Sequence, residues 1–204
     1  MRRILLFALL LAFPALAAAA PTRTVLVMGD SLSAAYGLEV SQGWVTLLQA
    51  RLKAQGHNYT VVNGSVSGET AEGGLTRLPQ ELQNARPAVV ILELGANDGL
   101  RGLPLNTLED NLGRMIVLSS KAGAKVLLVG ILLPPNYGPD YTRGFTRIYV
   151  SLAKRYKLPL VPFLLAGVAE HRELMQADGL HPIAAAEPKV LDNVWSRLLP
   201  LLDK

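Results

Sequence analysis

The sequence predicts a three-layer α/β domain built on a five-stranded parallel sheet. Two observations support this: five short apolar runs recur along the chain, and the segments between them have helical spacing. Continuous apolar runs suit strands that are buried on both faces of a parallel sheet. Regular alternation of strand and helix then favours right-handed crossovers with helices on both faces. The predicted strands are 24–28, 59–63, 88–93, 125–130 and 158–162.

The helices between these strands are predicted from apolar residues that recur every three or four positions. Gly56 and Gly123 stand where the first and a later helix should end, because glycine readily adopts the left-handed conformation of a helix C-terminus. The predicted apolar helix faces are Trp44, Leu47, Leu48 and Leu52; Leu105, Leu108, Leu112, Met115 and Ile116; Phe145, Ile148, Tyr149 and Leu152; and Val190, Val194 and Leu198.

The first twenty residues have the three-part layout of a secretory signal. A basic start with Arg2 and Arg3 precedes the apolar run 4–13, and Pro14 then leads into an alanine-rich stretch with small-residue cleavage sites. The alternative is a membrane anchor, but the apolar run is short for a span of about 20 residues. We therefore expect a cleavable signal over 1–20 and a single domain over 21–204.

Charge and cysteine content exclude several classes of protein. The formal net charge is +4, and without Arg2 and Arg3 there remain 18 basic residues against 16 acidic ones. The basic residues are scattered rather than clustered, which argues against a nucleic-acid partner. With no cysteine in the chain, disulfides, thiolate metal sites, a cysteine nucleophile and a lipoprotein anchor are excluded.

Polar loops follow the first three predicted strands, where the active site of a parallel sheet lies. Gly29-Asp30-Ser31 allows a sharp turn that presents Ser31, although Asp and Ser are also common helix N-caps. In 63–70, glycines flanked by small residues allow a backbone N–H to face a ligand closely. In 95–99, the amide of Asn97 can donate to an oxyanion. A flexible loop and an ordinary turn are the alternatives for these last two motifs.

A fourth motif, Asp178-Gly179-Leu180-His181-Pro182, contains the histidine best suited to catalysis. His57 and His171 lie in polar stretches and are predicted to be surface residues. Pro182 restricts the backbone of His181. Asp178 lies three residues earlier and can reach Nδ1 of the imidazole, which leaves Nε2 free to act as a base. The alternative is an Asp-Gly turn that merely starts the last helix.

Together, the order of the four motifs resembles that of the SGNH (GDSL-type) hydrolase superfamily, and the resemblance spans residues 29–182. The segments GDSLSAAYG, NGSVSGET, ELGANDGLRG, LLPPNYG and DGLHP are similar to those of its bacterial periplasmic acyl-thioesterase, lysophospholipase and arylesterase group. The resemblance implies a flavodoxin-like α/β/α fold and a periplasmic location. It implies that Ser31 is the nucleophile, His181 the general base and Asp178 its orienting residue, with an oxyanion hole formed by Ser31, Gly68 and Asn97.

These roles predict hydrolysis of esters and thioesters through an acyl-enzyme, with no metal or organic cofactor. Amide cleavage is expected only as a side activity. By resemblance, the loop 99–103 closes on the acyl chain, so Leu103 is a predicted substrate contact; a simple connection is the alternative. Leu133, in the apolar loop after the fourth strand, is predicted to form a wall of the acyl groove. We expect a monomer that acts on a small acyl ester or lysophospholipid, without stable membrane insertion.

Two other functions remain open from the sequence. A carbohydrate O-acetylesterase or deacetylase would use the same triad, but the aromatic content of 6% offers few platforms for sugars. A non-catalytic binding protein on the same scaffold would be expected to lack the serine, the asparagine or the histidine, and all three are present.

Overall fold

The computed structural model describes residues 22–202, which form a parallel five-stranded sheet in the order β2-β1-β3-β4-β5. The predicted sheet is confirmed, with strand ends that differ by one or two residues. The last strand is the shortest, because Pro159 and Pro162 flank it and proline has no N–H for the sheet. The strands are β1 (Arg23–Gly29), β2 (Tyr59–Asn63), β3 (Val89–Glu93), β4 (Lys125–Val129) and β5 (Leu160–Val161).

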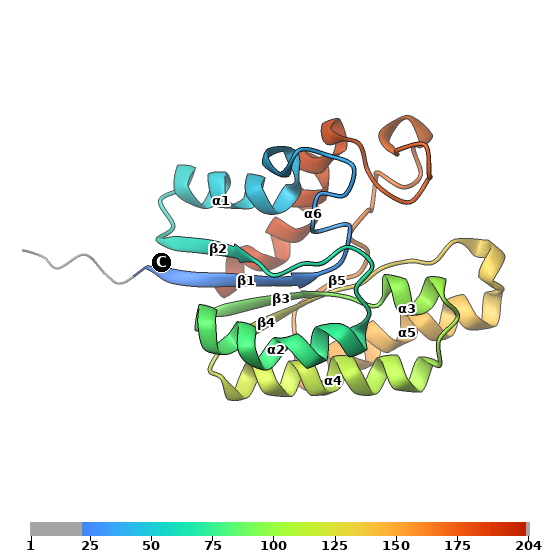
Figure 1. Ribbon diagram of the computed structural model, residues 1–204, viewed down its shortest axis with the longest axis horizontal. Coiled ribbons are helices and arrows are strands. Elements are labelled where there is room, and N and C mark those ends of the chain that lie inside the picture. Colours follow the sequence, from blue (N-terminus) through green and yellow to red (C-terminus); the bar gives the residue numbers. More distant parts are fainter. Residues whose placement is uncertain (1–21, 203–204) are drawn as a thin grey trace, which may run out of the picture.

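Helices cover both faces of the sheet (Figure 1), as the alternating pattern predicts. On one face lie α1 (Trp44–Ala54) and α6 (Glu187–Leu198), which pack against each other. On the other face, α4 (Leu105–Lys121) lies between α2 (Ala71–Ala85) and α5 (Pro139–Tyr156). Shorter elements are α3 (Ala96–Leu100) and the 3-10 turns Val40–Gln42, Pro135–Tyr137, Arg172–Leu174, Ala184–Ala186 and Leu199–Leu201.

The core forms because the strands are apolar on both faces and each helix contributes one apolar stripe. In β3, Val89 to Leu92 have no exposed surface, as expected for a central strand covered by helices on both sides. Gly56 and Gly123 follow α1 and α4 with φ angles of 75° and 86°, which confirms the predicted helix ends.

The strand order places the candidate site. β1 pairs with β2 on one side and with β3 on the other, so the chain direction across the sheet reverses beside β1. In such sheets, ligands bind beyond the carboxyl ends of the strands at this reversal point. None of the helices within residues 22–202 is long and apolar enough to cross a membrane.

Candidate active site

Ser31 lies in a tight turn that begins where β1 ends. The N–H of Leu32 donates to Oδ1 of Asp30 at 3.0 Å, which closes the turn around Ser31. Gly29 is required here, because a Cβ atom at this position would lie 2.7 Å from side-chain atoms of Ser33 and Glu93. No helix begins at Asp30 or Ser31, so the alternative interpretation of this motif as a helix N-cap is wrong.

The structure brings Ser31, His181 and Asp178 into one hydrogen-bonded chain, although 150 positions separate the serine from the histidine. Nε2 of His181 lies 2.8 Å from Oγ of Ser31, and Nδ1 lies 2.6 Å from Oδ2 of Asp178. The imidazole side chain is 14% exposed. This arrangement leaves Nε2 able to accept the serine proton when Nδ1 carries the ring hydrogen.

Asp178 is held in place by the backbone of its own motif. Its Oδ1 accepts the N–H groups of Leu180 at 2.9 Å and His181 at 3.1 Å. Gly179 has a φ angle of 68°, a conformation that glycine adopts without strain. Partial burial raises the pKa of Asp178, but hydrogen bonds from Leu180 and His181 outweigh it and bring the pKa below its usual value of 3.8. Asp178 is therefore an anion at neutral pH and can stabilise an imidazolium.

Gln176 joins the serine loop to the histidine loop, a contact that the sequence analysis missed. Its Nε2 donates to the carbonyl oxygens of Tyr36 at 2.8 Å and Pro182 at 2.9 Å. Its backbone N–H donates to the carbonyl oxygen of His181 at 2.7 Å. The two loops that supply Ser31 and His181 are thereby held at a fixed separation.

The oxyanion hole of Ser31, Gly68 and Asn97 stays a prediction, and the structure shows which hydrogen bonds these three groups already make. The amide N–H groups of Ser31 and Gly68 have no hydrogen-bond acceptor within residues 22–202, and Gly68 has a φ angle of 80°. Nδ2 of Asn97 lies beside the same turn, but it already donates to the carbonyl of Glu69 at 3.0 Å and to Asp30 at 3.3 Å. Gly68 itself does not line the cavity described below.

A pair of buried carboxyl groups supports the serine turn and was not predicted. Asp30 and Glu93 have no exposed surface. Oε2 of Glu93 accepts the hydroxyl of Ser33 at 2.5 Å, while its Oε1 has no hydrogen-bond partner. Burial and then the charge of Asp30 raise the pKa of Glu93 well above 4.5, and burial raises that of Asp30 to about 6. Burial therefore favours the neutral form of Glu93, and Asp30 is largely ionised at neutral pH. The one sequence feature that could have predicted this buried pair is Glu93 itself, an acidic residue at the end of the apolar strand β3.

A cavity of about 490 Å³ opens onto Ser31 and His181. It is mainly apolar, and Leu133 forms part of its wall, where the sequence analysis expected it. Leu103 does not line it; Leu100, three residues earlier, does. A substrate contact for Leu103 therefore stays a prediction. The other apolar lining residues include Ile131, Leu132, Pro134, Pro135, Phe163, Leu165, Met175 and Leu180.

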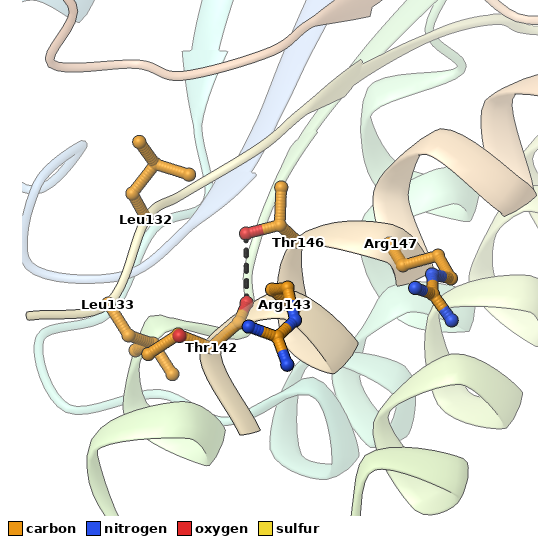
Figure 2. Close-up of a pocket in the computed structure, with 6 residues that line it drawn as sticks. All are labelled: Leu132, Leu133, Thr142, Arg143, Thr146 and Arg147. Atoms are coloured by element: carbon orange, nitrogen blue, oxygen red, sulfur yellow. Dashed lines mark hydrogen bonds between the residues drawn. The ribbon is translucent and has the colours of Figure 1, made fainter. Parts of the chain in front are cut away.

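A second recess of about 470 Å³ shares part of its lining with this cavity. Figure 2 shows Leu132 and Leu133 on the loop after β4, with their side chains pointing in opposite directions and Leu133 extending toward Thr142 of α5. Thr142 and Thr146 line the helix side, where the hydroxyl of Thr146 donates to the carbonyl of Thr142 at 3.0 Å. Leu132 and Leu133 line both hollows.

A parallel α/β sheet with hydrogen-bonded Ser, His and Asp side chains at its strand ends is typical of a class of hydrolases. Comparison with known proteins identifies the family within this class. Residues 27–187 match the GDSL-like Lipase/Acylhydrolase family. The chain belongs to this family, and its enzyme class is that of the carboxylic ester hydrolases.

Curated relatives and a solved structure agree with this assignment. The chain is 53% identical to "Esterase TesA" of Pseudomonas aeruginosa, covering 98% of this chain and all of that protein. It is 43% identical to "Arylesterase" of Vibrio mimicus, covering 95% and 97% of the two chains. The crystal structure of TesA superposes with a TM-score of 0.86 at 55% identity, covering 88% of this chain and all of that one. The fold expected from the resemblance to SGNH hydrolases is confirmed.

Proposed function

We propose that this chain is a serine esterase that cleaves carboxylic esters and thioesters through an acyl-enzyme on Ser31. The observation that carries the proposal is the hydrogen-bonded chain from Oγ of Ser31 through His181 to Asp178, with heavy-atom distances of 2.8 and 2.6 Å. Both distances are within the range that direct proton transfer and orientation of a base require.

The proposed reaction has two halves that use the same three side chains. His181 takes the Ser31 proton as Oγ attacks the carbonyl carbon, and Asp178 stabilises the imidazolium that forms. The imidazolium then protonates the departing alcohol or thiol, leaving the acyl group on Ser31. In the second half, His181 activates a water molecule that attacks the acyl-enzyme and releases the acid.

The negative oxygen of each tetrahedral intermediate needs donors that are placed in advance. The N–H groups of Ser31 and Gly68 suit this role because neither has a protein acceptor among the described residues. Asn97 can contribute by exchanging its 3.3 Å contact with Asp30 for the oxyanion. One such donor typically stabilises the transition state by roughly 3–4 kcal/mol.

The proposed substrates are esters with an apolar acyl chain. The cavity beside Ser31 is walled mainly by aliphatic side chains, including Leu133, and burial of each methylene contributes about 0.8 kcal/mol. The relatives support a broad range: one is named an arylesterase, and a third, from Escherichia coli at 41% identity over 97% of this chain and 92% of its own, is named thioesterase 1/protease 1/lysophospholipase L1.

Export to the periplasm and a single enzyme domain over 21–204 belong to the same proposal. The predicted signal over 1–20 lies outside the residues that the structure describes, so its support is the basic, apolar and alanine-rich order of the sequence. We further propose that the enzyme acts as a monomer, because the serine, the histidine and the aspartate all come from one chain.

Hydrolysis of a p-nitrophenyl ester series from acetate to palmitate tests the function. Wild type should hydrolyse medium-chain esters, whereas Ser31→Ala should lose at least a thousandfold in kcat with an unchanged melting temperature. Ser196→Ala, which removes an exposed serine on α6, is the matched control and should behave like wild type. Equal rates in all three proteins would overturn the proposal. Reaction with acetyl esters alone would instead favour an O-acetylesterase.

A further inference from the structure

Tyr36 is an exposed aromatic residue that packs against the imidazole of His181. The ring centroids lie 4.5 Å apart with a tilt of 37°. The Tyr36 residue is 51% exposed, and its hydroxyl makes no hydrogen bond within residues 22–202. An aromatic ring of this size usually buries its apolar surface. The open ring beside the imidazole therefore offers a surface to a ligand.

Two hydrogen bonds hold the backbone of Tyr36 in place, and its ring packs on His181. Its N–H donates to the carbonyl oxygen of Ser31 at 3.2 Å, and its own carbonyl accepts Nε2 of Gln176 at 2.8 Å. The preceding residue, Ala35, has a φ angle of 59°, which is strained for a residue with a Cβ atom. Strain of this kind persists where the surrounding structure enforces it, often beside functional groups.

The position of Tyr36 relates it to the leaving group. His181 must protonate the departing oxygen, so that atom comes within about 3 Å of Nε2. Tyr36 does not line the acyl cavity, whereas His181 does. A leaving group that passes the imidazole would come close to the ring that packs on it.

We infer that Tyr36 is a specificity-determining residue that binds aromatic leaving groups, such as phenols and benzyl alcohols, beside His181. This inference rests on the proposed esterase function. Offset or tilted aromatic pairs are favoured by about 0.5–1.5 kcal/mol beyond the burial of area. With about 1.4 kcal/mol per factor of ten, the aromatic preference that Tyr36 supplies is roughly two- to tenfold.

Benzyl octanoate and cyclohexylmethyl octanoate form a suitable test pair. They share the acyl chain, and their leaving groups are primary alcohols of similar size that differ in aromatic character. We expect Tyr36→Leu to lower the benzyl-to-cyclohexylmethyl ratio of kcat/KM by roughly two- to tenfold. Tyr36→Phe keeps the ring and should keep the ratio. Val150→Ala, an exposed apolar site on α5, is the control and should change neither ester.

The outcomes separate this inference from the proposed function. If Tyr36→Leu slows both esters equally, the ring only supports His181 and the inference is wrong, although the esterase function stands. A ratio that falls in Tyr36→Phe as well would assign the effect to the hydroxyl and would also overturn it. If wild type hydrolyses neither ester, the proposed function fails together with the inference.

Discussion

Glu93 accepts a 2.5 Å hydrogen bond from the hydroxyl of Ser33 in the protein interior. Ser33 lies two residues after Ser31 in the chain. Oε2 of Glu93 also lies 3.5 Å from the amide nitrogen of Asp30. One carboxyl group therefore contacts the residues on both sides of Ser31 in this turn. Gly29 leaves the space that this carboxyl group occupies. Glu93 is therefore a positioning residue for Ser31 that has no contact with the cavity.

Glu93→Gln should keep kcat within a few-fold of wild type, whereas Glu93→Ala should lower both kcat and stability. Burial and the nearby Asp30 raise the pKa of Glu93, which favours its neutral form, and a neutral amide reproduces that form. Alanine leaves the Ser33 hydroxyl without its partner, at a cost of about 1–3 kcal/mol. Rates with p-nitrophenyl octanoate and thermal unfolding would measure both effects. A loss in Glu93→Gln as large as that in Glu93→Ala would mean that the ionised form is needed.

Asp178→Asn should lower kcat by about 10⁴-fold with little change in the melting temperature. The asparagine amide donates to Nδ1, which places the ring proton on Nε2 and prevents the imidazole from accepting the Ser31 proton. Single-turnover rates would report the loss directly. Asp110→Asn changes an exposed aspartate on α4 and should leave kcat unaltered. Wild-type activity in Asp178→Asn would remove the aspartate from the mechanism.

Leu133→Ala should shift the preferred ester toward longer acyl chains. Leu133 lines both the cavity at Ser31 and the recess beside α5 (Figure 2), so its truncation should enlarge the space open to an acyl chain. Each additional buried methylene contributes about 0.8 kcal/mol, or roughly fourfold in kcat/KM. Because Leu133 is 9% exposed, unfolding should also become easier by about 2–5 kcal/mol. An unchanged chain-length profile in correctly folded protein would place the acyl chain elsewhere.

The sheet and the candidate triad were predictable because their signals are local. Apolar runs identify strands buried on both faces, and polar motifs directly after them mark the edge where sites form. The shortened β5 also has a local cause in the prolines that flank it.

Supporting contacts were not predictable because they join residues far apart in sequence. Ser33 and Glu93 are 60 positions apart, and Gln176 contacts the carbonyl of Tyr36 across 140 positions. Glutamine is usually a surface residue, so its type gives no sign of such a contact. Only the folded chain shows that these residues surround Ser31 and His181. Leu100, at the end of helix α3, lines the cavity and was not predicted for the same reason.

Glu187→Gln should stabilise the protein above neutral pH and have little effect near pH 4. Glu187 is buried in α6 and accepts the N–H of Trp44 at 2.7 Å, and burial raises its pKa from 4.5 to about 7. Between these two values the folded state binds more protons than the unfolded state, so stability falls as pH rises from about 4.5 to 7. The difference corresponds to up to about 3 kcal/mol, which the neutral amide avoids. Denaturant unfolding from pH 4 to pH 8 would measure it, with Glu173→Gln, an exposed glutamate, as the control. An equal gain at every pH would show that packing, and not charge burial, is responsible.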